Sequence, residues 1–211
     1  MGYISVLKTW YPFLLEGLLW NLIISLIATF VGIMIGSVFV VMKFSKFWLV
    51  RRVGDFVPGV FRGAPTLFLL FYLSIIIPNE VSFFGGEFKV NISSWMKASI
   101  ALMASPLAFA AWNLHSSIKY WKSGQKSSAL LFVPNCMNGF LITFLASSGA
   151  SLVGVSELVG RTNTVIKAVG PESAILLYTN AVVIFLVSAW AISTIVNRLS
   201  SSISVRVLAD A

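Results

Sequence analysis

The stretch GLLWNLIISLIATFVGIMIG, residues 17–36, carries no charged side chain. A helix needs about 20 apolar residues to cross the hydrocarbon core of a bilayer, and this stretch is long enough. The apolar pattern continues on both sides, so we expect a tilted membrane-spanning helix over 14–42. Gly32 and Gly36 lie one helical turn apart within it. Small residues at this spacing predict a close contact with another helix.

The composition of the whole chain also favours a membrane protein. Of its 211 residues, 58% are hydrophobic and 10% are charged, whereas an ordinary soluble domain has about 25% charged residues. So few charges do not cover a water-facing surface. The net charge is +8, but the cations lie between apolar segments, which favours a role in membrane topology over nucleic-acid binding. The single cysteine excludes a disulfide framework and a cysteine-based metal site.

Four further apolar segments follow the first, at 57–78, 95–114, 128–155 and 173–196. We therefore predict an all-α membrane protein with five transmembrane helices, forming a single transmembrane domain over 1–211. The first residues lack the pattern of a cleavable signal peptide, so we expect the first apolar segment to remain as a span.

Lysine and arginine residues predict the orientation of these spans. If the amino terminus is outside, five of the fifteen cations fall in outer segments and the other ten in inner segments. The outer five are Lys8, Lys89, Lys97, Arg161 and Lys167. Because cytoplasmic loops carry the excess of cations, we expect the amino terminus outside and the carboxyl terminus in the cytoplasm. Segment 79–94, with Gly86, is then an outer loop, and segment 115–127, with Ser123, is an inner one.

The fourth segment is the most polar of the five. Its polar side chains are Asn135, Asn138, Thr143, Ser147, Ser148 and Ser151. Polar atoms in hydrocarbon are costly unless they are paired, so this helix should face other helices or a watery cavity. Two interpretations follow. The side chains either line a solute pathway or hydrogen-bond to neighbouring helices.

The sequence contains no arrangement typical of an enzyme. No paired carboxylates fall in a span, and no phosphate-binding loop is present. His115, the single histidine, lies at an inner helix end, where an interfacial position is a simpler reading than a proton relay. Cys136 is most simply a small buried side chain.

Five segments of the sequence resemble one protein family. They are GLLWNLIISLIATFVGIMIG (17–36), FRGAPTLFLLFYL (61–73), ASPLAFAAWNLHSSIKYWKSGQ (104–125), NGFLITFLASSGASLVGVSEL (138–158) and PESAILLYTNAVVIFLVSAWAISTIVNRL (171–199). In this order they resemble the polar amino-acid ABC importer permeases of the histidine/glutamine type. The motifs FRGAP and SLVGVSEL are the most specific for this family. Their motif positions are Phe61, Arg62, Gly63, Pro65, Gly154 and Glu157.

The resemblance implies a type I importer permease in a bacterial inner membrane. In that family two permease subunits form the pathway, and an extracytoplasmic binding protein delivers the solute. Two cytoplasmic ATPases bind ATP and magnesium and drive transport, so no cofactor and no catalytic residue are expected on this chain.

The chain departs from the family at the coupling loop. In the family the dipeptide GQ is followed by WEAARALGLS, which forms a short helix that docks on the ATPase. Here GQKSSALLFVP, 124–134, runs directly into the fourth span. Roughly twenty residues are absent, enough for about five helical turns. Lys119, Lys122, Gln125 and Lys126 form the remaining ATPase-facing turn, although the lysines are equally explained as ordinary inner-loop cations.

Charged family positions in the spans are also replaced. Leu145 and Ala146 stand where the family has Lys-Asp, and Trp112 stands where it has a glutamate. We therefore expect the pathway to be lined by Trp112, Asn138, Ser147, Ser148 and Ser151. The leading hypothesis is a permease subunit for amino acids or a similar small polar solute, degenerate in coupling and working in a heterodimer. The alternatives are a non-transporting membrane scaffold or regulator, and an energy-independent channel.

Overall fold

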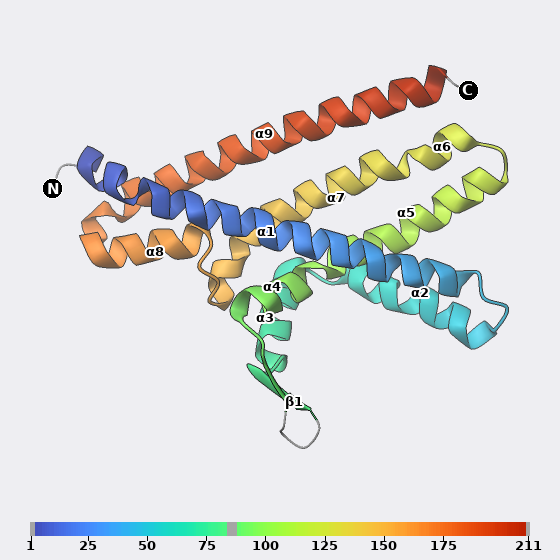
Figure 1. Ribbon diagram of the computed structural model, residues 1–211, viewed down its shortest axis with the longest axis horizontal. Helices are drawn as coiled ribbons and strands as arrows, with labels where there is room; N and C mark the ends of the chain where they lie inside the picture. The colour runs from blue at the N-terminus through green and yellow to red at the C-terminus, as the bar shows by residue number, and fades with distance from the viewer. Residues whose placement is uncertain (1–2, 84–87, 210–211) are drawn as a thin grey trace.

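The computed structural model describes residues 3–83 and 88–209 of the chain. It is mostly helical and elongated, and the two longest helices, α1 (Tyr3–Lys43) and α9 (Ala174–Ala209), extend along its long axis (Figure 1). The predicted helical class is confirmed. Gly86, which the charge pattern assigns to an outer loop, lies outside the described residues.

Within residues 3–83 and 88–209, three helical segments are long and apolar enough to cross a membrane: Ser5–Lys43, Ser128–Val153 and Pro171–Ser201. They correspond to the first, fourth and fifth predicted spans. The first and last are longer than predicted because their helices continue past the most apolar residues. The chain therefore has the apolar helices that a multi-pass membrane protein requires.

The second predicted span, 57–78, is wrong as a single helix. It is divided between α2 (Trp48–Gly63) and α3 (Thr66–Ile76), whose axes differ in direction by 107°. Ala64 and Pro65 are both in an extended conformation at the break. A proline disfavours helical geometry in the residue before it, so Pro65 ends α2 and begins α3. Counted as one bent span, this pair raises the number of candidate spans from three to four.

The third predicted span, 95–114, is also divided. It comprises α4 (Ser94–Leu102) and α5 (Ala104–Lys122), which meet at Met103. Neither helix alone is both long and apolar enough to qualify as a span. The five-span count accordingly stays a prediction.

A short β-hairpin, absent from the all-α prediction, joins α3 to α4. Strands β1 (Glu80–Phe83) and β2 (Phe88–Asn91) pair antiparallel, and the hairpin projects away from the long helices (Figure 1). An exposed ion pair joins Lys89 to Glu80 across the strands at 3.0 Å. The residues between the strands, 84–87, lie outside the described part of the chain.

The second half of the chain begins with a tight turn. Residues 123–125 separate α5 from α6 (Lys126–Leu130), and Gly124 there has a φ of +85°. The chain then forms α7 (Phe132–Ser147) and the 3₁₀ segment η2 (Ser148–Val153).

A helix between the last two spans was not predicted from the sequence. This helix, α8 (Leu158–Val169), is followed by η3 (Pro171–Ser173) and then by α9. Leu158 and Val165 of α8 are buried with Leu14 of α1 and Leu177 of α9. These buried apolar side chains hold α8 against the other two helices.

Close packing joins α1 to α5. A Cβ atom added at Gly32 would lie 2.7 Å from the Met103 carbonyl oxygen, and one at Gly36 would lie 2.6 Å from the Leu107 carbonyl oxygen. These distances leave no room for a side chain. Both glycines therefore lie on a helix contact within the chain, where small residues let two backbones approach.

Candidate functional site

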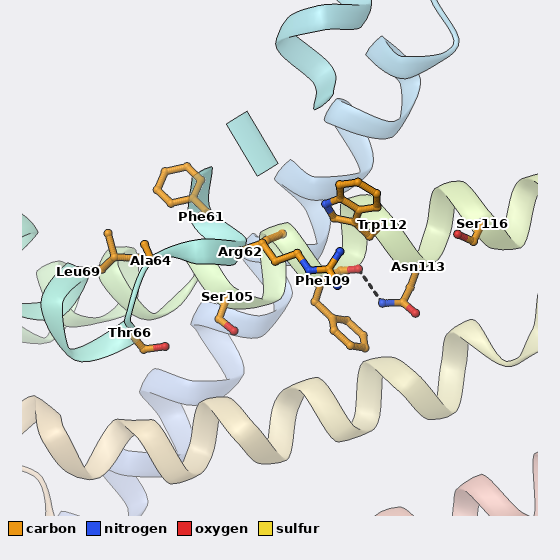
Figure 2. Close-up of a pocket in the computed structure, with 11 residues that line it drawn as sticks. Phe61, Arg62, Ala64, Thr66, Leu69, Ser105, Phe109, Trp112, Asn113 and Ser116 are labelled. Atoms are coloured by element: carbon orange, nitrogen blue, oxygen red, sulfur yellow. Dashed lines mark hydrogen bonds between the residues drawn. The ribbon is translucent and has the colours of Figure 1, made fainter. Parts of the chain in front are cut away.

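A pocket of about 460 Å³ opens between the α2–α3 break and α5 (Figure 2). It is lined by Phe61, Arg62, Ala64, Thr66, Leu69, Ser105, Ala108, Phe109, Trp112, Asn113 and Ser116. This volume is in the lower part of the range for small-molecule sites, about 300–1,000 Å³. The pocket is the candidate functional site.

The local sequence explains why these side chains meet. The break at Pro65 places Arg62, in the last turn of α2, and Thr66, the first residue of α3, beside one opening. On α5, Ser105, Phe109 and Trp112 follow one another at intervals of four and three residues. Helical residues at these intervals share one face, so one side of α5 forms the opposite wall.

Two cations flank the indole of Trp112. Lys43 Nζ lies 4.4 Å from the ring centroid, and Arg62 Cζ lies 5.1 Å from it. Figure 2 shows Arg62 extending from α2 toward this ring. The Lys43 side chain is only 2% exposed and also forms an ion pair with Asp55 at 3.3 Å. Cation–π contacts of this kind are worth up to about 2 kcal/mol when the cation is desolvated.

Asn113 connects the pocket wall to α7. Its Nδ2 donates to the Phe109 carbonyl oxygen at 3.0 Å (dashed in Figure 2), and its Oδ1 accepts from Asn135 Nδ2 at 3.2 Å. Both hydrogen bonds fix the orientation of the amide. The wall of the pocket is thereby held by a polar contact between two helices.

His115 lies between the pocket-lining residues Asn113 and Ser116 on α5, and its ring centroid is 4.9 Å from that of Phe44. Among the described residues, none forms a hydrogen bond with its buried Nδ1 atom.

Of the five predicted pathway residues, only Trp112 lines the pocket. Ser147 is buried, accepts a hydrogen bond from Asn21 Nδ2 at 3.0 Å, and donates to the Phe144 carbonyl oxygen at 2.7 Å. Ser148 and Ser151 donate to backbone carbonyls one turn earlier. Asn138 is exposed on α7. Ser147 therefore hydrogen-bonds to a neighbouring helix, which is one of the two interpretations of this segment; the other was a solute pathway.

The family motif SLVGVSEL forms a turn and a helix cap. Gly154 has a φ of +84°, a left-handed conformation that favours glycine. Glu157 is fully buried, and its carboxylate accepts hydrogen bonds from the backbone N–H groups of Val159 (3.0 Å) and Gly160 (3.1 Å). A carboxylate in this position satisfies free donors at the start of α8. These motif residues therefore position α8 and lie away from the pocket.

An ion pair that the sequence reasoning missed joins α8 to α1. Arg161 donates from Nη1 to Glu16 Oε2 at 2.6 Å and from Nη2 to Oε1 at 2.7 Å. It also donates to the carbonyl oxygens of Phe13 and Ser156, both at 3.1 Å. The partners Glu16 and Arg161 lie 145 residues apart, so no local pattern indicates them.

The predicted ATPase-facing turn is exposed and short. Lys119, Lys122, Gln125 and Lys126 are all exposed, and Lys122 Nζ lies 4.6 Å from the centroid of the Phe44 ring. Only residues 123–125 separate α5 from α6, so no further helix intervenes there.

Comparisons with solved structures identify the fold. The chain matches a chain in the crystal structure of an amino acid ABC transporter with histidines, with a TM-score of 0.77 and 18% sequence identity. The match covers 96% of this chain and 99% of that one. A second match, to the inward-facing MetNI methionine ABC transporter, has a TM-score of 0.61 and 15% identity, with the same coverage. The protein therefore has the fold of an ABC transporter permease.

Sequence comparisons indicate which kind of permease the chain resembles. It is 29% identical over 119 residues to the arginine transport system permease protein ArtQ of Bacillus subtilis and to the glutamate/aspartate import permease protein GltK of Escherichia coli O157:H7. These matches cover 56% of this chain, and 51% and 53% of the two relatives. A probable amino-acid ABC transporter permease protein of B. subtilis, YckA, is 26% identical over 161 residues, 71% of each chain.

The chain thus spans about half the length of the first relatives it matches. No protein-family model matches the chain. The resemblance to amino-acid ABC permeases is nonetheless confirmed, because relatives and structural neighbours agree. The relatives are named as transport or import permease proteins, and this chain has helices long and apolar enough to cross a membrane.

Proposed function

We propose that the chain is a transmembrane permease subunit of an ATP-driven ABC importer for amino acids or a similar small polar solute. The observation that carries this proposal is the fold match, which covers 96% of the chain at a TM-score of 0.77. The names of the sequence relatives support the amino-acid class. The pocket beside Trp112 supplies a space of the size that such a solute requires.

The proposed arrangement has five spans with the amino terminus outside. In it α2 and α3 form a bent second span, and α4 and α5 together form the third. The excess of cations in the segments assigned to the cytoplasm supports this orientation. The bacterial inner membrane is the expected location.

The proposed partners are a second permease subunit, cytoplasmic ATPase subunits and an extracytoplasmic solute-binding protein. ATP and magnesium would bind to the ATPase, and this chain needs no cofactor. The three-residue turn at 123–125 supports a degenerate role in coupling, because a family coupling helix occupies many more residues. A full-length second permease would then transmit most of the ATPase motion.

The pathway is proposed to pass the pocket wall at Trp112. Asn138, Ser148 and Ser151 do not line the pocket, and they remain candidates for a part of the pathway to which a second permease would add a wall. The exposed position of Asn138 supports this assignment.

Purification of the tagged chain from its native membranes in mild detergent tests the proposal. We expect an ATPase and a second permease to co-purify in stoichiometric amounts, as identified by mass spectrometry. The complex in proteoliposomes should then take up a labelled amino acid when ATP and the binding protein are supplied. A chain that co-purifies with no ATPase, and whose liposomes show no ATP-dependent uptake, would contradict it.

A non-transporting scaffold is the second candidate, and the short coupling turn is the observation that favours it. The same preparation separates the two candidates. A scaffold would co-purify with partners, yet its removal would leave ATP-dependent uptake by the remaining subunits unchanged.

A further inference from the structure

The helix α3 presents a broad apolar face that the described chain leaves exposed. Its exposed side chains recur in adjacent pairs at intervals of four residues, so they form two neighbouring rows on one side of the helix. Ile75 is 83% exposed, the highest value among the large apolar side chains described. The six side chains of this surface, which we call the α3 face, are Leu67, Phe68, Phe71, Tyr72, Ile75 and Ile76.

The opposite side of α3 is anchored in the molecule. Leu70 is fully buried in one cluster with Ile24 of α1. Lys97 of α4 donates from Nζ to Asn79 Oδ1 at 2.7 Å and to the Ser74 carbonyl oxygen at 3.4 Å. From this anchored side, α3 leads to the hairpin that projects away from the long helices (Figure 1). The α3 face is therefore preformed, so a partner that binds it does not have to order the helix first.

The α3 face is richer in aromatic side chains than the exposed part of α9. Three of its six side chains are aromatic, and the rings of Phe68 and Tyr72 stack with centroids 5.5 Å apart. Aromatic residues are enriched at the centre of protein interfaces and dominate their energetics. Over 182–187 of α9 the exposed side chains are all aliphatic, namely Val182, Val183, Leu186 and Val187. This difference favours a protein partner on α3.

The α3 face also has a polar border. The hairpin begins at Glu80, shortly after α3 ends at Ile76. Its ion pair joins Lys89 to Glu80, and their side chains are 62% and 45% exposed. Ionised side chains are costly in hydrocarbon, so lipid tails alone do not suit this border. An apolar centre with a polar rim is the usual arrangement of a protein–protein interface.

The position of α3 beside the pocket indicates which subunit covers it. Leu69 of α3 lines the pocket and lies three residues before Tyr72, so the two side chains are neighbours on the helix. The pocket is a candidate part of the solute pathway, to which a second permease would add a wall. The short turn at 123–125 favours a partner that differs from this chain, because two copies would have no coupling helix between them.

From these observations we infer that the α3 face is the contact surface for a second, full-length permease subunit. The inference rests on the proposed function, because it names the surface through which the two permeases assemble. Phe71 and Tyr72 are expected to contribute most to the contact, since a few large side chains carry most of the energy of an interface.

The test places a photo-crosslinking amino acid, p-benzoylphenylalanine, at Tyr72 of the tagged chain in its native membranes. After irradiation the chain is purified under denaturing conditions, and its adducts are identified by mass spectrometry. We expect an adduct with a permease that is longer than this chain and has an intact coupling loop. Val183 of α9 is the matched control position, since Val183 and Tyr72 are 52% and 51% exposed. At Val183 we expect no permease adduct.

Alanine substitutions measure the strength of the same contact. Phe71→Ala combined with Tyr72→Ala should lower recovery of the second permease with the tagged chain at least about fivefold, because truncated aromatic anchors give the largest losses. Val183→Ala combined with Val187→Ala is the control and should leave this recovery unchanged. All four side chains are exposed, so we expect both variants to fold, and equal yields of the chain in the membrane check this.

Several outcomes would overturn the inference. Adducts with lipid alone at Tyr72, or a permease adduct of equal yield at Val183, would leave an aromatic belt at the membrane surface as the explanation of the α3 face. An adduct between two copies of this chain, or with a solute-binding protein, would identify a different partner. Unchanged recovery of the second permease in the Phe71→Ala and Tyr72→Ala variant would also contradict the inference.

Failure of this inference is distinguishable from failure of the proposed function. If the unmodified chain co-purifies with an ATPase and a second permease, but Tyr72 gives no permease adduct, only the contact surface is wrong. If Tyr72 gives the permease adduct, but the complex shows no ATP-dependent uptake, only the transport role is wrong.

Discussion

The two ends of α1 hold positive charge in different ways. At the α8 end, Arg161 is 7% exposed, and its guanidinium is bound by both carboxylate oxygens of Glu16 and by two backbone carbonyls. At the α2 end, Lys43 and Arg62 lie against one indole ring, and a single carboxylate, that of Asp55, pairs with Lys43. The Arg161–Glu16 pair is neutral, whereas the group formed by Lys43, Asp55 and Arg62 retains one positive charge.

Under the proposed function, this difference separates a structural end of α1 from the end that carries the candidate binding site. A bidentate arginine–carboxylate pair has a fixed geometry, and it holds α8 against α1. A cation–π contact does not neutralise the cation, so the exposed Arg62 remains available to a ligand or a partner. The α8 end should therefore respond to substitution with lost stability, and the α2 end with altered binding.

The largest expected effect is a difference in labelling between two cysteines, one near each end of α1. The five-span arrangement predicts that Ala168 of α8 is outside and Ser123 is cytoplasmic. In a Cys136→Ser background, an impermeant thiol reagent applied to intact cells should label Ala168→Cys fully and Ser123→Cys only after lysis. Labelling of both cysteines in intact cells would place the two ends on one side and contradict the predicted topology.

The packing of the two ends can be compared at two glycines. A Cβ atom at Gly17 would lie 2.8 Å from Leu158 Cα, whereas one at Gly59 of α2 would meet nothing within 4 Å. We expect Gly17→Leu to destabilise the fold by about 3 kcal/mol, the upper part of the usual overpacking range. Gly59→Leu should not destabilise the fold and should raise its stability by up to about 1 kcal/mol, because leucine has the higher helix propensity. Thermal unfolding in detergent measures both, and equal effects would show that the ends are packed alike.

Two asparagine side chains, one at each end, sharpen the comparison further. Asn21 is fully buried and hydrogen-bonds with both Ser147 Oγ and the Leu158 backbone N–H. Asn21→Leu leaves that N–H without a partner, and we expect a loss of about 2–3 kcal/mol. Asn113→Leu, at the half-buried amide of the pocket wall, should cost about 1 kcal/mol. If Asn113→Leu lowers the free energy of unfolding more than Asn21→Leu does in the same assay, the α2 end and not the α8 end is the structural one.

The smallest effect is expected at the turn next to the α2 end. Exposed charge contacts contribute about 0–1 kcal/mol each, so Lys119, Lys122 and Lys126 offer little to a rigid coupling device. Their combined change to Ala should reduce solute-stimulated ATP hydrolysis of the complex by less than about fivefold. A matched disruption of the proposed partner permease's coupling helix should abolish solute-stimulated ATP hydrolysis. Complete loss in the triple variant would mean that the short turn is itself the coupling element.

The sequence alone determined the membrane class, the position of three apolar helices and the resemblance to amino-acid permeases. These properties depend on local runs of residues, since the length of an apolar segment decides whether it crosses a bilayer. A local signal for the bend was also present. Pro65 disfavours helix in the residue before it, yet the apolar run 57–78 predicted a single span, because hydropathy contains no information about a change in helix direction.

Only the tertiary structure decided which side chains meet. Ser147 was a pathway candidate by its position in an apolar segment, but its partner Asn21 lies 126 residues earlier. Arg62 was recognised as a motif position, and its place over Trp112 depends on the break between α2 and α3. Hydrogen bonds and charge pairs between helices are set by the faces that pack together, and the spacing of residues along one segment does not specify which faces those are.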